Sequence, residues 1–131
     1  MRATSAWFVA LAAGLLVASA CDSGPQAGEL EISLVSPDAD DGAIMIEVRA
    51  LESYSIEGLT AACAGCQAFV YQETEMRLKA IVIGSFGTGA VARVSVSDAK
   101  SPEGYVLTVL DAAGPDLQLR SADTRSLRFL P

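Results

Sequence analysis

Cys63 and Cys66 are the residues of this 131-residue chain whose type and spacing most clearly suggest chemistry. A Cys-x-x-Cys pair can exchange disulfides when a helix N-terminus lowers the pKa of the first thiol. Here the β-forming segment QAFVYQ follows Cys66 directly, so no helix is expected to stabilise a thiolate. We favour a structural disulfide that tightens this loop, with a redox pair and a zinc site as alternatives. Zinc is the weaker one, because the chain has no histidine and only these two candidate thiolate ligands.

Asp38, Asp40 and Asp41 form a second cluster, in the segment DADDG. Clustered carboxylates before a glycine are typical of calcium loops, which need hard oxygen ligands and a sharp turn. An EF-hand loop starting at Asp38 would require a glutamate where Arg49 stands. We therefore predict a hairpin turn with solvated charges, and leave open whether the three aspartates bind calcium.

Catalysis by the commonest routes has no support in the sequence. Without histidine there is no Ser-His-Asp triad and no imidazole base. The segment GSFGTG at residues 84–89 lacks the lysine that follows a phosphate-binding glycine loop. Paired carboxylates could hydrolyse glycosides, but a domain of this size offers little room for a substrate cleft. We predict a protein that is not an enzyme, with no catalytic residue, no metal ligand and no cofactor.

The first 20 residues have the pattern of an export signal. Arg2 precedes residues 6–17, which contain no charged side chain. This apolar run is shorter than the roughly 20 residues needed to span a bilayer, and it ends in the small residues Ala18, Ser19 and Ala20. We predict that residues 1–20 are a signal peptide absent from the mature protein.

Cys21 decides between two kinds of export. The segment Val17-Ala18-Ser19-Ala20-Cys21 resembles the lipobox of bacterial lipoproteins, although the family prefers leucine where Ala18 stands. The resemblance implies that Cys21 receives diacylglycerol, that cleavage occurs before it, and that the protein is anchored to a membrane of the cell envelope. Plain secretion after Ala18-Ser19-Ala20 is the alternative. If Cys21 carries lipid, Cys63 and Cys66 remain as an even pair, and an oxidising envelope compartment would preserve their disulfide.

The mature chain begins with a polar segment and carries a strong negative charge. Residues 21–28 are rich in Gly, Pro and Ser, which predicts a lipidated, flexible tether. Without Arg2, eight basic residues face sixteen acidic ones, a net charge of −8. This charge argues against nucleic acid as a partner and against electrostatic attraction to anionic lipid. The acyl chains would then provide the attachment to membrane lipid.

Residues 29–131 are dominated by a two-residue period. Leu30, Ile32 and Leu34 alternate with polar residues, and Ile44, Ile46 and Val48 do the same, which predicts two strands paired as a hairpin. Residues 51–62 have no clean period and are expected to form a long loop or a single helical turn. The strand at residues 76–83 places Arg77 and Lys79 on one face with Ile81 and Ile83, so we expect it to end buried on both sides.

Seven or eight such strands, with no amphipathic helix between them, predict an all-β protein with a single antiparallel β-sandwich. The order GELEISLVSPDADDGAIMIEVRA, then a long loop, then GTGAVARVSV resembles cohesin-like β-sandwiches. Those modules sit in bacterial surface proteins and are related in fold to carbohydrate-binding modules. The resemblance implies a binding or structural module but assigns no partner-binding residue.

Two functions follow from these patterns. The favoured one is a non-enzymatic envelope lipoprotein, periplasmic or surface-facing, that binds or supports an envelope protein or a glycan. The alternative is a tethered thiol–disulfide protein that uses Cys63 and Cys66.

Overall fold

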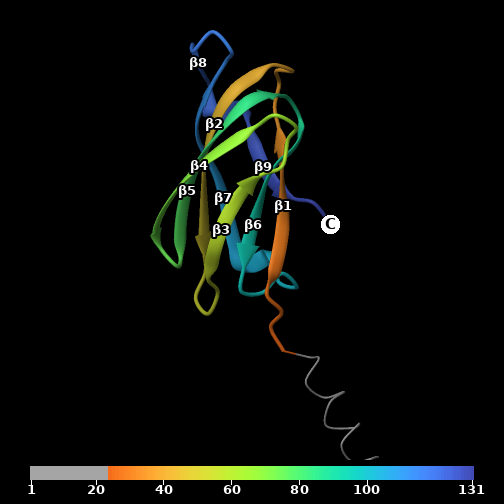
Figure 1. Cartoon of the computed structure of the whole chain (residues 1–131), viewed down its shortest axis with the longest axis vertical. Coiled ribbons are helices and arrows are strands. Elements are labelled where there is room, and N and C mark those ends of the chain that lie inside the picture. The colour runs from red at the N-terminus through yellow and green to blue at the C-terminus, as the bar shows by residue number, and fades with distance from the viewer. Residues whose placement is uncertain (1–23) are drawn as a thin grey trace, which may run out of the picture.

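The protein is a sandwich of two antiparallel β-sheets (Figure 1). The computed structural model describes residues 24–131, so the predicted signal peptide and Cys21 lie outside the described residues. One sheet has the strand order β3-β6-β1-β9, and the other has the order β4-β5-β2-β7-β8. The predicted all-β antiparallel sandwich is confirmed.

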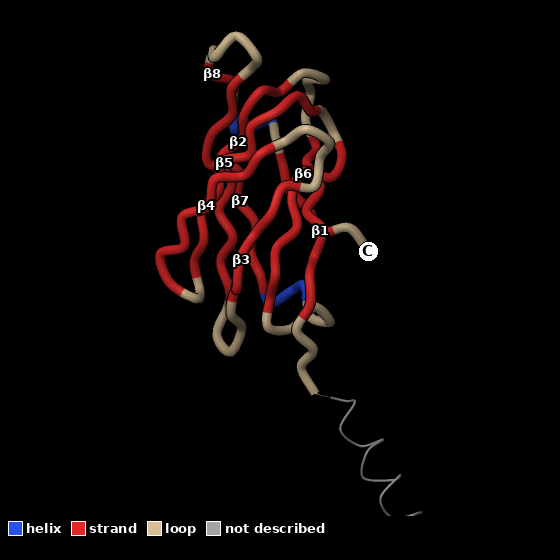
Figure 2. The backbone as a smooth tube through the Cα atoms, viewed as in Figure 1, coloured by secondary structure: helices blue, strands red, loops and turns tan. Residues whose placement is uncertain are grey.

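Nine strands make up these sheets within the described residues, together with two short 3-10 helices (Figure 2). The strands are β1 (Gly28–Val35), β2 (Asp41–Ala50), β3 (Ile56–Ala61), β4 (Gln67–Thr74), β5 (Arg77–Phe86), β6 (Gly89–Val96), β7 (Tyr105–Ala113), β8 (Leu119–Arg120) and β9 (Ser126–Phe129). The 3-10 helices are η2 (Pro102–Gly104) and η3 (Ala122–Thr124).

The core lies between the two sheets and follows the two-residue period. In β2, Ile44, Ile46 and Val48 point inward and are fully buried, while the residues between them point outward. Each such side chain stabilises the fold by about 1.5–3 kcal/mol on full burial. The largest fully buried apolar side chains come from both sheets: Ile32, Leu34, Ile44, Ile46, Val48, Ile56, Leu78, Val82, Val91, Val94 and Val96.

The predicted hairpin between the first two strands is wrong. β1 pairs with β6 and β9, whereas β2 pairs with β5 and β7 in the other sheet. The segment between them therefore crosses from one sheet to the other. Alternation could not distinguish the two arrangements, because a strand with one apolar face looks the same whether its neighbour lies beside it or across the core.

Residues 51–62, expected to form a loop, contain strand β3, which the sequence pattern did not predict. The pairing of β3 with β6 shifts register between Ile56 and Gly58, so a β-bulge interrupts the strand. The bulge spaces the two buried residues, Ile56 and Leu59, by three positions instead of two. The strand therefore shows no two-residue period.

The described part of the predicted tether, residues 24–27, is hydrogen-bonded to the domain through Gln26. The Gln26 backbone N–H donates to Asp98 Oδ1 (N···O 3.2 Å), and the Ala99 N–H donates to the Gln26 carbonyl (2.7 Å). Asp98 also accepts from the Lys100 N–H and the Ser101 hydroxyl. The chain is thus attached to the domain two residues before β1 begins, at the end of the sandwich opposite the β7–β8 turn (Figure 1).

Candidate functional site

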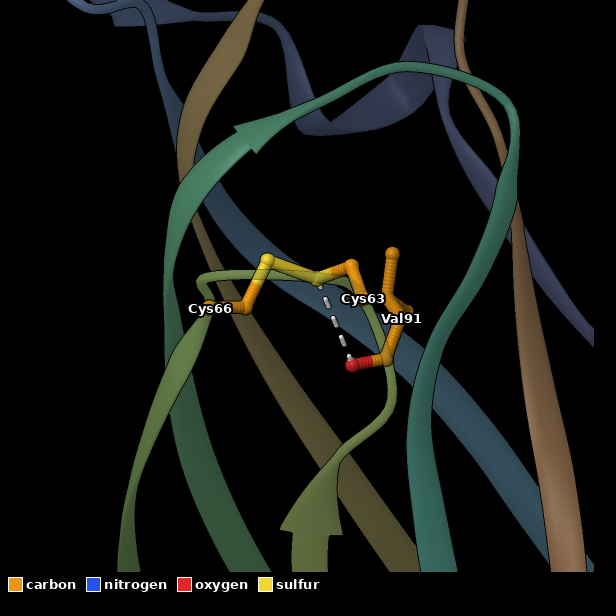
Figure 3. The surroundings of a disulfide bond; sticks show 3 residues. All are labelled: Cys63, Cys66 and Val91. Atoms are coloured by element: carbon orange, nitrogen blue, oxygen red, sulfur yellow. Dashed lines mark hydrogen bonds between the residues drawn. A yellow bond between two sulfur atoms is a disulfide. The ribbon is translucent and has the colours of Figure 1, made fainter.

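The structure places Cys63 and Cys66 in the loop that connects β3 and β4, which are edge strands of opposite sheets. Their sulfurs are bonded, and their Cα atoms lie 5.4 Å apart (Figure 3). The pair is half-buried and packs against the core. The disulfide therefore closes a small ring within the connection between the two sheets.

Neighbouring strands fit closely around this disulfide. The Val91 carbonyl of β6 accepts a hydrogen bond from the Ala62 N–H (2.9 Å) and lies 3.9 Å from Cys63 Sγ (Figure 3). A disulfide sulfur carries no hydrogen, so Cys63 Sγ only contacts the Val91 carbonyl oxygen. The Cys63 thiol could donate a hydrogen bond to that oxygen only after reduction. A Cβ at Gly84 in β5 would lie 2.6 Å from Cys66 Sγ, so only glycine leaves room for the sulfur.

The local backbone does not favour redox chemistry. β4 begins at Gln67, directly after Cys66, so a strand rather than a helix N-terminus follows the pair. A helix N-terminus is the usual source of positive potential that stabilises the attacking thiolate. The geometry supports a structural disulfide.

The predicted hairpin turn with solvated charges is wrong for Asp41, whereas the Asp38 and Asp40 side chains are 42% and 63% exposed. Asp41 is fully buried and begins β2. Arg125 binds it with two hydrogen bonds, from Nε to Oδ2 (3.1 Å) and from Nη2 to Oδ1 (2.7 Å). Arg120 Nη1 contacts Asp41 Oδ1 (3.1 Å) and Asp40 Oδ1 (3.0 Å), while Arg125 also bonds Asp38.

This aspartate–arginine cluster links the β1–β2 crossover to the C-terminal segment. Burial by itself would raise the pKa of Asp41, but hydrogen bonds from Arg125, Ser36 and Arg120 outweigh it and hold the pKa below its usual value. Because the guanidinium groups occupy these carboxylate oxygens, a calcium ion would have to displace them. Within residues 24–131, no group of three or more His, Cys, Asp or Glu side chains is arranged to hold a metal ion.

The outer face of the five-stranded sheet carries an exposed apolar stripe. Register places Phe69 of β4 beside Ile81 of β5, and Ile81 beside Met45 of β2. A second row runs from Ile83 through Ala43 and Ala113 to Leu119 of β8. We refer to these residues together as the apolar stripe: Ala43, Met45, Phe69, Ile81, Ile83, Ala113 and Leu119.

Two shallow hollows lie along this stripe and share Met45 and Ile81. One, of about 310 Å³, also contacts Phe69, Tyr71 and Lys79. The other, of about 180 Å³, extends across Asp111 to Leu119. Together they are lined by residues of all five strands of this sheet, most of them apolar, with Lys79 and Asp111 as the charged ones.

The stripe corrects the expectation that the strand at residues 76–83 ends buried on both sides. Leu78, Ala80 and Val82 face the core, but Ile83 on the opposite face is 45% exposed. Phe69 and Leu119 are exposed by 56% and 78%. No further layer of the described chain covers this face, since the sandwich has only two sheets.

Comparison with known proteins found no relative of this chain. No protein family matches the sequence, and neither curated proteins nor solved structures provide a match. The resemblances to the lipobox and to cohesin-like modules remain predictions. Within residues 24–131, no helix is long and apolar enough to cross a membrane.

Sequence patterns missed both the arginines and the stripe. Arg125 lies 84 residues from Asp41 along the chain, so no local pattern relates them. The stripe had a partial signal, because Ile81 and Ile83 occupy the same face as Arg77 and Lys79. That alternation identifies a shared face but not whether another layer covers it.

Proposed function

We propose that this protein is a membrane-anchored envelope lipoprotein whose β-sandwich binds an envelope component through the apolar stripe. The observation that carries the proposal is the stripe itself. Large contiguous apolar surfaces are uncommon on monomeric soluble domains and commonly mark interaction sites. The exposed Phe69 and the half-buried Met45 are of residue types enriched at such sites.

The position of the tether supports this proposal. The tether continues into β1, which belongs to the four-stranded sheet, whereas the stripe lies on the outer face of the five-stranded sheet. Attachment through Cys21 would therefore leave the stripe on the side of the sandwich away from the anchored strand. A partner in the envelope, either a protein or a glycan, could reach it without displacing the tether.

A pair of matched variants tests the stripe. Ile83→Glu introduces a charge into the stripe, and Leu51→Glu introduces the same charge at an equally exposed leucine in the β2–β3 loop, with exposures of 45% and 44%. Full-length protein is cross-linked in its own envelope, and the co-purified proteins are compared. Binding to purified envelope glycan is measured by sedimentation.

The proposal expects one protein or glycan interaction that is lost in Ile83→Glu and retained in Leu51→Glu. An exposed charge substitution should change folding stability by no more than about 0.5 kcal/mol, so misfolding should not explain the loss. Equal binding by wild type and both variants, in both assays, would contradict the proposal.

A further inference from the structure

β4 (Gln67–Thr74) is an unpaired edge of the five-stranded sheet. It pairs with β5 on one side, and no strand of the described residues pairs with its other side. Every β4 residue except Ala68 is exposed. The backbone groups along that side are consequently free to accept another strand.

The other edge strands of the described chain are shorter than β4, and the register shift of β4 lies at its far end, between Gln72 and Thr74. β3 is bulged and contains Glu57, β9 has only four residues, and β8 has only two. β4 has no proline, lysine or arginine, and its pairing with β5 stays regular from Gln67 to Gln72. Bulges, short length and charged side chains are the usual means of preventing edge pairing. β4 is therefore the edge of this domain best suited to strand addition.

The charges near β4 also permit pairing. Glu73 is its only charged residue, and Lys79 Nζ lies 3.2 Å from Glu73 Oε1, with Arg77 Nη1 at 3.9 Å from Oε2. The carboxylate is thus neutralised within its own chain. Although the net charge of −8 expected for the mature chain without Arg2 repels two copies in general, the β4 edge itself presents little charge.

We propose that β4 pairs antiparallel with β4 of a second copy of this chain, with Val70 opposite Val70 on a two-fold axis. In this register Phe69 of each copy faces Tyr71 of the other, and Ala68 faces Gln72, all within the part of β4 that pairs regularly with β5. The two aromatic pairs are favourable across strands, and no like charges oppose each other. Each copy contributes side chains to one apolar surface, because Phe69 and Tyr71 alternate onto the same face as Ile81.

This symmetry is compatible with two anchors in one membrane. The two-fold axis runs perpendicular to the joined sheet, so both copies turn the same face toward the membrane. Both tethers then leave from the four-stranded sheets, and both apolar stripes face away. The five residues from Asp22 to Gln26 reach at most about 18 Å, enough to connect Cys21 to a domain lying flat on the headgroups.

The pairing is expected mainly at the membrane, and this step rests on the proposed anchor. Pairing along one strand buries less surface than the roughly 800 Å² per partner that is typical of stable soluble complexes. Confinement to one membrane raises the effective concentration of the copies and favours a weak interface.

Cysteine cross-linking of the full chain in its membrane tests the register. Directly opposed residues of antiparallel strands have Cα atoms about 4.5–5.5 Å apart, within the range that a disulfide spans. With mild diamide oxidation, Val70→Cys should cross-link to itself, giving a band of twice the chain mass on a non-reducing gel. Phe69→Cys and Tyr71→Cys, expressed together, should cross-link several-fold more than either alone.

Leu119→Cys is the matched control, because Leu119 is more exposed than Val70 (78% against 43%) but lies in β8. Its self-cross-link should be several-fold weaker than that of Val70→Cys. Adding Cys21→Ser to Val70→Cys should reduce the cross-link, whereas adding Ile83→Glu should not. Loss of the Val70→Cys cross-link on adding Ile83→Glu would show that the apolar stripe, and not the β4 edge, brings the copies together. That result would overturn the proposed edge pairing.

Three further outcomes would overturn the proposal. Equal yields at positions 70 and 119 would indicate random encounter in the membrane. A stronger self-cross-link at Phe69→Cys or Tyr71→Cys would contradict the register. An adduct of Val70→Cys with a protein of another mass would show that the edge binds a different partner.

Discussion

At the scale of single residues, the buried pair of Asp41 and Arg125 is the strongest polar constraint described. Asp41 is fully buried, and the Arg125 side chain is 1% exposed. Ser36, Ser121 and Arg120 complete the hydrogen bonding around them. Replacing Arg125 removes two hydrogen bonds from the buried Asp41 carboxylate and leaves it a single guanidinium contact, from Arg120.

We expect Arg125→Met to lower the free energy of unfolding by about 3–5 kcal/mol, measured by urea denaturation at pH 7. The matched control is Arg93→Met, because the Arg93–Glu31 pair is 3.6 Å long and its side chains are 46% and 38% exposed. Solvent screens that pair, so its loss should cost at most about 1 kcal/mol. Similar losses in the two variants would contradict a special role for the buried pair.

Folding stability should also depend on pH through Asp41 and Asp98. The Gln26 backbone N–H is the main cause of a lowered pKa at Asp98, followed by the Ser101 hydroxyl. A carboxylate whose pKa is lower in the folded state contributes stability above its unfolded pKa of about 3.9. That contribution is lost as pH falls through this value toward the folded pKa.

The urea midpoint of the wild type should therefore decrease steeply between about pH 4 and pH 2. Asp98→Asn, which cannot titrate, should be less stable at pH 7 and show a shallower decrease over the same range. An identical slope in wild type and Asp98→Asn would exclude Asp98 as a source of the pH dependence.

At the scale of elements, the Cys63–Cys66 loop joins β3 and β4 across the two sheets and depends on Gly84 of β5. Closing so short a ring is expected to stabilise the fold by roughly 2 kcal/mol through loss of unfolded-chain entropy. The close approach of Cys66 Sγ to Gly84 makes the disulfide and the glycine interdependent.

Gly84→Ala should destabilise the native protein by about 1–3 kcal/mol, because its Cβ would overlap the sulfur of Cys66. The same substitution should cost less in a Cys63→Ala/Cys66→Ala background, where the sulfur is gone. A thermal-melting double-mutant cycle measures this coupling. Equal costs in both backgrounds would show that the overlap with sulfur is unimportant.

The edge strands show why elements of similar composition behave differently. A bulge in β3 hid its two-residue period, yet the same bulge protects that edge from pairing. β4 pairs regularly with β5 from Gln67 to Gln72, and its own register shift lies only at its far end, between Gln72 and Thr74. The local features that made β4 easy to predict therefore also make it suitable for pairing with another strand.

At the scale of the whole molecule, the proposed lipid anchor determines where the protein is held, and the β-sandwich carries the proposed binding surface. The tether is clamped to the loop after β6 through Gln26 and Asp98. Attachment would then hold the domain close to the membrane while the apolar stripe faces the opposite side.

Cys21→Ser should release the protein from the membrane fraction into the soluble envelope fraction, because no acyl chain would then be added. Intact mass spectrometry of the wild type should show cleavage before Cys21, added acyl mass, and two fewer hydrogens at Cys63 and Cys66. Retention of Cys21→Ser in the membrane fraction would contradict lipid anchoring.

The sequence by itself determined the class of fold, because the two-residue alternation of apolar side chains is a local property of each strand. Ile44, Ile46 and Val48 identify β2 and its buried face without reference to any other element. The spacing of Cys63 and Cys66 likewise suggested a disulfide, since a pair so close in sequence needs no long-range information.

Only the tertiary structure decided which strands are neighbours and which faces remain uncovered. The chain crosses from one sheet to the other between β1 and β2, Asp41 is buried against Arg125, and Ile83 stays exposed. All three features depend on contacts between residues that are distant in sequence. Alternation specifies that a strand has two faces, but packing of the layers determines whether the second face meets protein or solvent. In this chain the outer face of the five-stranded sheet meets solvent, and for that reason it can serve as the proposed binding surface.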